Sequence, residues 1–377
     1  MDKIKEYFLK MTDRISFVEL RENAQLKIKG YAAEKGLPLP IVTDTLVEEI
    51  KKGSLKESIN LSHIIEGMIY ILGIDVDFKH NEEYKRILYS FNPKIEDFML
   101  YSGLKLDEEG KYDDSAIVFR ALVNLNSKNI NGLFNYALQL ERIAKKFIES
   151  ENDEKGNEFL RKSTELLESI LDLDPNYALS YYKLGYHYKN YGQFQKARLI
   201  WEKYLSIDDD KERLQEIREE IRLINDDAEY EEGINHISRG NYNEALDKLY
   251  PLLQKHNDNW NLFYMAGIAY KGLGDYEKAI ENFVEAINLG GEHPDLYNEL
   301  GICLFGIGNT NEAIDILTKG IELYKDNYRL VFNRGLIYLN LGLYDNALKD
   351  IKEAHDLNPE DITVKNMFDK LKSYNMG

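Results

Sequence analysis

The 377-residue sequence holds few groups of side chains that could do chemistry together. The most suggestive run is Asp75-Val-Asp77-Phe-Lys-His80, which supplies two carboxylates and an imidazole. A calcium-binding EF-hand loop also needs a third oxygen ligand, a glycine and a distal glutamate at fixed offsets, and Asn81-Glu82 does not supply them. We therefore predict a polar turn before a helix capped by Asn81, and no metal site.

The single cysteine and the seven histidines form no catalytic pattern either. Cys303 lies within an expected helix and has no basic neighbour in sequence, so we predict a packing thiol rather than a nucleophile. The histidines lack the H-E-x-x-H spacing of a zinc protease, and we predict that His187 and His236 lie on helix surfaces. The sequence thus predicts a protein that is not an enzyme and that has no catalytic, cofactor-binding or metal-binding residues.

Charge and composition limit the classes of partner and compartment. The net charge is −18, and residues 1–95 carry 15 basic and 15 acidic side chains, so the acidic excess belongs entirely to residues 96–377. A nucleic-acid binder needs clustered positive charge to displace counterions, so no nucleic-acid partner is expected. A single cysteine suits a reducing compartment, and no apolar run reaches signal-peptide or transmembrane length. We expect an acidic, cytoplasmic protein without membrane insertion.

A glycine recurs at a fixed interval along the acidic part of the chain. Its positions are Gly110, Gly192, Gly240, Gly274, Gly308 and Gly342. The last three intervals are 34 residues each, the interval before them is 34 plus 14, and the first is twice 34 plus 14. A period of this length, broken only by two inserts of equal size, indicates a tandem repeat of one supersecondary unit.

Other residue types recur around each of these turn glycines. A second glycine stands seven positions earlier, at Gly103, Gly185, Gly233, Gly267, Gly301 and Gly335. An aromatic residue follows the turn glycine by two positions in five of the six copies, and a small residue follows it by five positions in all. The early glycine and the small residue let two helices approach closely, and the turn glycine ends the first helix. Each repeat is therefore predicted to be a helical hairpin with the aromatic residue at its base.

This pattern resembles the tetratricopeptide repeat (TPR) family, whose signature is W-x2-L-G-x2-Y followed by A-x3-F. Repeat three supplies the matching residues Tyr181, Leu184, Gly185, Tyr188, Ala197 and Trp201. The resemblance covers residues 96–361, but the first signature position is never tryptophan, Glu229 is its poorest match, and repeat two (130–177) lacks the glycines. The resemblance implies an all-α fold, an α–α superhelix or TPR solenoid, and a protein-binding function.

The chain is expected to divide into five parts. They are an N-terminal helical region at 1–95, TPR repeats one to three at 96–211, an extra amphipathic helix at 212–225, TPR repeats four to seven at 226–361, and a C-terminal capping helix at 362–377. The 212–225 helix carries an apolar stripe of Leu214, Ile217, Ile221 and Ile224, and we expect it to cover repeat three and interrupt the array. The two terminal parts are expected to cover the apolar ends of the solenoid.

Within residues 1–95 the spacing of apolar residues predicts four or five helices. The first has an apolar face made of Phe17, Leu20, Ala24, Ile28 and Tyr31, and Gly36 can end it. The run Leu37-Pro38-Leu39-Pro40 is expected to be an extended connector. Three further helices are expected to start at Thr43 or Asp44, at Ser62 as a cap, and after Asn81 as a cap, and the second of them is apolar nearly all round and should be buried.

One exposed surface has a composition typical of a binding site. Positions 2, 5, 9 and 12 of each first helix share a face that turns away from the helix-packing seam, and in the family this face lines a concave groove. The candidate groove residues are Leu179, Tyr182, Tyr186, Lys189, Tyr230, Ile234, Ile237, Asn261, Tyr264, Ile268, Lys271, Asn298, Ile302, Phe305, Phe332, Leu336 and Leu339. Solvent-facing helix positions usually avoid so many aromatic and branched apolar side chains. Either the groove is open for a partner, or superhelical curvature and the inserted helix already fill it.

These observations favour a non-catalytic scaffold that binds a peptide or partner helix in an apolar groove edged with acidic residues. A first alternative is a peptide-responsive regulator in which an N-terminal helical bundle, residues 1–95, is the effector part. A second alternative is an enzyme whose site lies unrecognised in residues 1–95.

Overall fold

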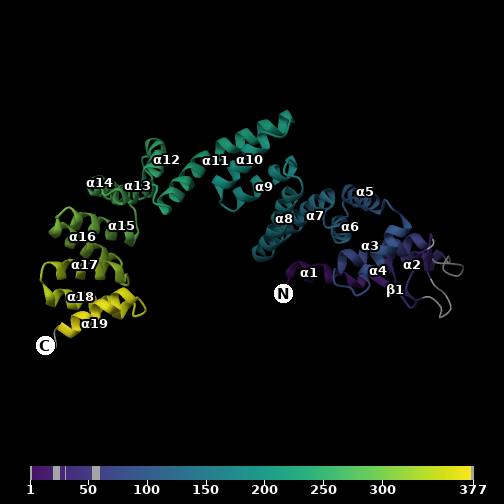
Figure 1. Cartoon of the computed structure of the whole chain (residues 1–377), viewed down its shortest axis with the longest axis horizontal. Helices are drawn as coiled ribbons and strands as arrows, with labels where there is room; N and C mark the ends of the chain where they lie inside the picture. Colours follow the sequence, from purple (N-terminus) through teal and green to yellow (C-terminus); the bar gives the residue numbers. More distant parts are fainter. Residues whose placement is uncertain (1, 20–25, 30, 53–59, 375–377) are drawn as a thin grey trace. The chain divides into compact units, whose positions relative to one another are not determined.

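The computed structural model describes residues 2–19, 26–29, 31–52 and 60–374, which are mostly helical (Figure 1). The chain divides into two compact units, which are described separately below. Unit 1 comprises Met1–Tyr191 with Ile200–Ile217, and unit 2 comprises Gly192–Leu199 with Arg218–Gly377. Within the described ranges, no helix combines the length and the apolar character needed to cross a bilayer.

The N-terminal part of unit 1 mixes helices with short strands. Its elements in chain order are α1 (Lys3–Leu9), the 3-10 turn η1 (Thr12–Arg14), β1 (Ile15–Val18), β2 (Lys27–Ile28), β3 (Tyr31–Ala32), β4 (Leu39–Val42), α2 (Thr43–Lys52), α3 (Leu61–Ile74) and α4 (Asn81–Phe91). Strand β1 pairs antiparallel with β4, with Ile15 opposite Val42, and β2 pairs antiparallel with β3.

The predicted helix over Phe17–Tyr31 is wrong. Phe17 lies in β1, Ile28 in β2 and Tyr31 in β3, while Leu20 and Ala24 lie outside the described residues. The physical reason is that Ile15–Val18 alternates buried and more open side chains and pairs with a distant segment, which a helical reading of a short apolar run cannot anticipate. Gly36 has a φ of +75°, so it makes a turn between strands instead of ending a helix.

The three later helices of this region are confirmed, with different caps. Helix α2 starts at Thr43, and α3 buries ten of its residues, as its all-round apolar sequence predicted. Asn60, rather than Ser62, caps α3 by accepting a hydrogen bond from the Ser62 backbone N–H. Helix α3 packs on the first repeat through α6, so this region does cover the start of the repeats within unit 1.

The repeats are helical hairpins, as the period predicted (Figure 1). The helix pairs are α5 (Ile95–Glu108) with α6 (Tyr112–Leu125), α7 (Ile130–Glu149) with α8 (Asp153–Leu173), α9 (Ala178–Asn190) with α10 (Phe194–Leu205), α11 (Lys211–Ser238) with α12 (Tyr242–Lys255), α13 (Trp260–Leu273) with α14 (Tyr276–Asn288), α15 (Pro294–Gly306) with α16 (Thr310–Leu323), and α17 (Tyr328–Asn340) with α18 (Tyr344–Leu357). A last helix, α19 (Ile362–Tyr374), follows them and buries Val364 and Leu371.

The recurring glycines do what their positions predicted. All six turn glycines have φ between +68° and +89°, a left-handed conformation that glycine adopts without steric cost. A Cβ atom on Gly267 would lie 2.6 Å from the Phe283 ring, and one on Gly301 would lie 2.7 Å from Leu317. These early glycines therefore allow the close approach of the two helices within their hairpins.

The two inserts have different structural outcomes. The first lengthens both helices of repeat two, to 20 residues in α7 and 21 in α8, compared with 13 and 14 in α17 and α18. The second does not form a separate helix at 212–225, because α11 runs unbroken for 28 residues into repeat four. No glycine or proline stands between Lys211 and Gly233 to end it. Its predicted inward stripe is present, since Ile217 and Ile224 are buried.

Candidate functional site

The acidic turn before α4 is a structural turn, as predicted. The Asp75 carboxylate accepts a hydrogen bond from the Asp77 backbone N–H at 3.1 Å. The side-chain amide of Asn81 donates to the carbonyls of Asp75 and Val76 at 2.8 and 3.0 Å, so it ties the turn back instead of capping α4. Among the described residues, no three histidine, cysteine, aspartate or glutamate side chains come together in a way that could hold a metal ion.

Cys303 is a packing thiol. It lies in α15, is fully buried, and belongs to the apolar core that includes Phe283 and Leu317. Burial raises the pKa of the Cys303 thiol to about 11, so the reactive thiolate is scarce at neutral pH.

The prediction that His187 lies on a helix surface is wrong. The His187 ring is only 3% exposed and connects two neighbouring repeats. Its Nδ1 lies 2.8 Å from the Thr164 hydroxyl of α8, and its Nε2 lies 3.1 Å from the Glu141 carboxylate of α7. No sequence pattern signals this network, because Glu141, Thr164 and His187 lie on three different helices. His236 is partly buried, with Nε2 3.9 Å from the Glu232 carboxylate.

The hydroxyl, imidazole and carboxylate of this network follow the order of a hydrolytic triad. Their burial and hydrogen bonds indicate a structural role instead. Thr164 is only 6% exposed. Its hydroxyl oxygen also lies 2.9 Å from the Leu160 carbonyl and 2.8 Å from the Tyr191 hydroxyl, so it has no open side for a substrate. Glu141 is held further by an ion pair with Lys183 at 2.6 Å. The network therefore fastens α7, α8 and α9 together.

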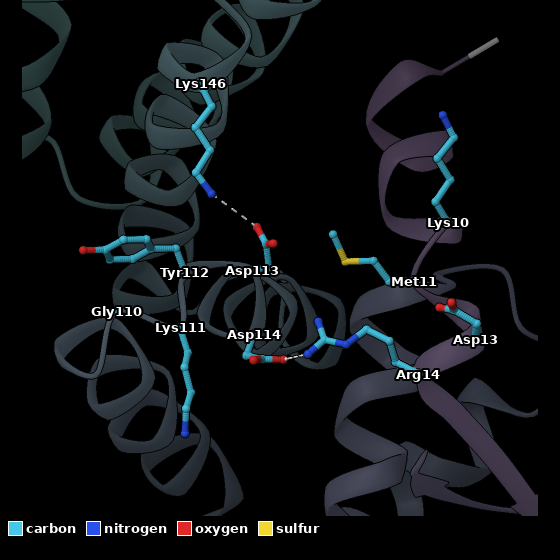
Figure 2. A pocket seen from close by; sticks show the side chains of 10 residues that line it. All are labelled: Lys10, Met11, Asp13, Arg14, Gly110, Lys111, Tyr112, Asp113, Asp114 and Lys146. Carbon is cyan, nitrogen blue, oxygen red and sulfur yellow. Dashed lines mark hydrogen bonds and ion pairs between the residues drawn. The ribbon is translucent and has the colours of Figure 1, made fainter. Parts of the chain in front are cut away.

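A polar pocket of about 460 Å³ lies between the segment after α1 and the turn that joins α5 to α6 (Figure 2). Three of its basic side chains are paired within it or at its edge: Arg14 with Asp114 at 2.5 Å, Lys146 with Asp113 at 3.7 Å, and Lys111 with Glu109 at 2.8 Å. Figure 2 shows the Arg14–Asp114 pair bridging the two walls. We interpret this pocket as a polar seam that attaches the N-terminal segment to the first repeat.

The candidate groove residues are mostly half-buried. Asn298 is buried, with 7% of its surface exposed, and Ile302 is the most exposed, at 37%. The others are intermediate in exposure: Leu179, Tyr182, Tyr186 and Lys189 on α9; Tyr230, Ile234 and Ile237 on α11; Asn261, Tyr264, Ile268 and Lys271 on α13; Phe305 on α15; and Phe332, Leu336 and Leu339 on α17. The residues on α9 belong to unit 1 and the remainder belong to unit 2, so they form two surfaces that must be described apart.

In unit 1 the chain itself contacts the α9 residues, which we call the tyrosine segment (Leu179, Tyr182, Tyr186 and Lys189). The hydroxyls of Tyr182 and Tyr186 both donate to the same Glu216 carboxylate oxygen, and the Tyr182 bond is 3.0 Å long. Glu216 stands near the start of α11, in the second insert. Burial, followed by this carboxylate, raises the pKa of both phenols. Part of the tyrosine segment is therefore already engaged by the inserted residues.

In unit 2 the corresponding residues form a surface that we call the unit 2 groove. Its members are Tyr230, Ile234, Ile237, Asn261, Tyr264, Ile268, Lys271, Asn298, Ile302, Phe305, Phe332, Leu336 and Leu339. The sequence placed this face away from the helix-packing seam, but Tyr264 and Ile268 also pack against the buried core of the neighbouring hairpins. The Tyr264 ring centroid lies 5.9 Å from that of Phe283. Only part of each of these two side chains is open to a partner.

Polar and acidic groups accompany this apolar surface. Lys271 of α13 forms an ion pair with Glu299 of α15, and the Asn333 amide donates to Asn298 at 2.6 Å, so both contacts join neighbouring first helices. Burial, then the negative charges of Asp295 and Glu299, raises the pKa of the Tyr264 phenol. The apolar groove residues in the middle of unit 2 therefore stand close to acidic side chains.

Known proteins resemble this chain through its helical repeats. A search of curated proteins gave no match. Among solved structures, a chain of the Cut9–Hcn1 complex of the APC/C is 13% identical with a TM-score of 0.39, and the match spans 82% of this chain and 62% of that one. A tetratricopeptide repeat protein from Parabacteroides merdae is 17% identical (TM-score 0.35, 73% of this chain and 98% of that one), and the Arabidopsis OM64 TPR domain is 23% identical (TM-score 0.30, 31% and 96%).

Sequence profiles of the tetratricopeptide repeat match residues 264–328 and 329–361. These ranges contain the hairpins with the regular 34-residue period and the left-handed turn glycines. Tetratricopeptide repeats support a role as a protein–protein interaction scaffold. The chain is a tetratricopeptide repeat protein, an all-α solenoid of helical hairpins with a partly stranded N-terminal region.

Proposed function

We propose that the protein is a non-catalytic scaffold that binds a peptide or a partner helix in the unit 2 groove. The observation that carries this proposal is the row of partly exposed apolar side chains at equivalent positions of successive first helices: Tyr264 and Ile268 on α13, Ile302 and Phe305 on α15, and Phe332, Leu336 and Leu339 on α17. Apolar surface that is connected and rimmed by polar groups is typical of a protein-binding site.

The arrangement of these helices supports an elongated ligand. Helix α13 contacts α15, and α15 contacts α17, so their groove residues form consecutive rows instead of isolated patches. A peptide or helix can place successive apolar side chains against successive rows, which is how helices bind in hydrophobic grooves. Asp295 and Glu299 beside Tyr264 would favour a partner with basic residues at that place.

The chain offers a matched pair of positions to test this proposal. Ile302 faces the unit 2 groove and is 37% exposed, and Val284 lies on the second helix α14 and is 41% exposed. Both are branched apolar residues on helices, with nearly equal exposure. We would place a photo-crosslinking amino acid at either position in the full chain and identify the products formed in the native extract.

We expect position 302 to crosslink a specific partner and position 284 to crosslink none. With that partner in hand, Ile302→Asp should weaken binding by at least about 2 kcal/mol, or roughly 30-fold, because a charge would be buried where the partner must shed water. Val284→Asp should leave affinity unchanged. Equal affinities of the two variants for the partner would refute binding in the groove.

The regulatory alternative was based on an N-terminal region made only of helices. That region contains the paired strands β1–β4 and β2–β3 among its described residues. The enzymatic alternative has no supporting observation among the described residues of this region.

A further inference from the structure

A largely apolar pocket lies in unit 1 between helices α3 and α5. It encloses about 570 Å³, a size suited to a small organic ligand or a large side chain. Its apolar wall includes Ile65, Ile69 and Tyr70 of α3, Phe98 and Leu106 of α5, and Val118 of α6. We call this the α3–α5 pocket.

The pocket exists because of how three helices pack. Helices α3 and α5 each pack on α6, which lies beneath both. Ile65 and Ile69 of α3 are buried and form the floor of the pocket, whereas Phe98 of α5 is 48% exposed at its rim. Binding of a ligand that removes such exposed apolar surface from water is favourable.

One carboxylate of this pocket has no hydrogen-bond or ion-pair partner among the described residues. Glu66 of α3 lines the pocket and is partly buried, and within the described ranges it makes no hydrogen bond or ion pair. Burial raises the pKa of Glu66, and the charge of nearby Asp114 adds to the effect while His63 opposes it. A carboxylate that has lost water without gaining a hydrogen bond is stabilised by any cation placed beside it.

The other charged groups at this place are already satisfied. Lys111 pairs with Glu109 at 2.8 Å, and Lys105 approaches the same carboxylate at 3.9 Å. Asp114 accepts from Arg14 at 2.5 Å and from the Tyr70 hydroxyl at 3.1 Å. Glu66 is therefore the acidic group of the α3–α5 pocket that can pair with a cation, and His63, which also lines the pocket, is its basic neighbour.

We propose that the α3–α5 pocket binds a ligand with an apolar body and a cationic end, whose ammonium or guanidinium group pairs with Glu66. The apolar body covers the exposed ring of Phe98 above the floor formed by Ile65 and Ile69, and the cation donates a hydrogen bond to the Glu66 carboxylate. This site lies in unit 1 and shares no residue with the unit 2 groove.

A series of three small probes of equal length tests the proposal. The probes are 4-phenylbutylamine, 4-phenylbutanol and 4-phenylbutyrate, which share the apolar body and differ in the charge of the end. Binding to the full chain is followed by NMR of ¹³C-labelled isoleucine methyl groups, with Ile65 and Ile69 as local reporters. We expect the amine to shift both reporters and to bind about ten-fold more tightly than the alcohol, since a hydrogen bond between two charged groups is stronger than one from a neutral hydroxyl.

The Glu66→Gln variant should abolish the advantage of the amine over the alcohol. The matched control is Glu165→Gln, which removes a carboxylate of the same unit that does not line this pocket, and it should preserve the advantage. Phe98→Ala should weaken the amine and the alcohol alike, because Phe98 contacts the apolar body. Circular dichroism melting curves verify that each variant is folded.

A capped dipeptide, acetyl-Phe-Lys-amide, separates the two sources of such a ligand. If it binds more tightly than the amine and depends on Glu66, the ligand is a basic side chain of a partner protein; if only the amine binds, the ligand is a free small molecule. The proposal is wrong if the butyrate binds as well as the amine, or if Glu66→Gln leaves the order of the three affinities unchanged.

Discussion

The tyrosine segment of unit 1 and the unit 2 groove occupy the same positions in their repeats, yet their side chains have different partners. Tyr182 and Tyr264 both stand at position 5 of a first helix. The Tyr182 hydroxyl donates to Glu216, a residue contributed by the second insert. The Tyr264 ring packs on Phe283 of its own hairpin, and its phenol is close to the acidic side chains of α15.

The position of a residue in the repeat therefore determines where its side chain lies, but not whether that side chain is free to bind a partner protein. The second insert extends α11 by several turns, and its first residues supply Glu216 to α9 and Arg213 to Tyr204 of α10. In repeats five to seven no such insert is present, and the apolar residues at the same positions remain partly exposed. We therefore propose that the self-filled alternative applies to the tyrosine segment and the open alternative to the unit 2 groove.

The largest expected effect comes from removing the ring that supports the tyrosine segment. Trp201 is fully buried, its indole N–H donates to the Tyr182 carbonyl at 3.2 Å, and its ring centroid lies 5.0 Å from that of Tyr186. Trp201→Ala should lower the free energy of unfolding by about 3–5 kcal/mol, because it opens a large cavity. Guanidinium unfolding measures the change, and a loss below about 1 kcal/mol would contradict this packing.

The next effect concerns the contact between the insert and the tyrosine segment. Glu216→Ala leaves the hydroxyls of Tyr182 and Tyr186 without their shared acceptor, and we expect a loss of about 1 kcal/mol, since Glu216 is exposed and water can replace it. Glu212→Ala, an exposed carboxylate one turn earlier on the same helix, is the control. Equal stability of both variants would show that the contact contributes nothing.

The sequence predicted the repeated hairpins well because their determinants are local. The turn glycines need a positive φ, and the early glycines need the absence of a side chain, and both requirements appear directly as residue types at fixed spacing. The 34-residue period then gives the limits of the regular hairpins, whereas the second 14-residue excess lies within α11 instead of forming a separate helix. The same reasoning predicted the C-terminal helix, whose Val364 and Leu371 are buried.

What the sequence missed depends on contacts between distant residues. The strands β1 and β4 pair across an intervening segment, and His187 is buried by partners on α7 and α8. Glu229, the poorest match to the family signature, pairs with Arg198 at 2.5 Å and Lys248 at 3.0 Å, so an ionic network replaces the expected apolar contact. The spacing of residue types along the sequence does not indicate which distant residues pair.

A smaller change in the free energy of unfolding is expected from a substitution that tests whether the unit 2 groove is open in the free protein. Ile302→Ser removes apolar surface that is already partly exposed, so the free energy of unfolding should change by no more than about 0.5 kcal/mol. Val284→Ser on α14 is the control of similar exposure, and it should behave alike. A loss of 2 kcal/mol or more for Ile302→Ser alone, measured by urea unfolding, would mean that the groove is core and that both units fill their own surfaces.

The smallest expected effect is on the ionisation of two tyrosines, and it distinguishes the causes of their shifts. Burial and the Glu216 carboxylate raise the pKa of Tyr186, whereas burial and the charges of Asp295 and Glu299 raise the pKa of Tyr264. Both phenols therefore stay neutral in the folded chain above pH 10, the ordinary pKa of a tyrosine, while the unfolded chain ionises. Their contribution to stability is full below about pH 10 and is lost as the pH rises toward the folded-state pKa values.

Replacing Glu216 by glutamine should then change one tyrosine and not the other. In Glu216→Gln the negative charge beside Tyr186 is gone, so its pKa should fall toward the ordinary value, while the pKa of Tyr264 stays raised. NMR of ¹³C-ζ-labelled tyrosine follows both titrations, with Tyr186→Phe and Tyr264→Phe assigning the signals. Because Tyr186 then ionises at lower pH in the folded chain, the variant should lose slightly less stability between pH 9 and pH 11 than the unmodified protein. An unchanged Tyr186 titration would show that burial alone holds it neutral, and that the insert does not engage the tyrosine segment in solution.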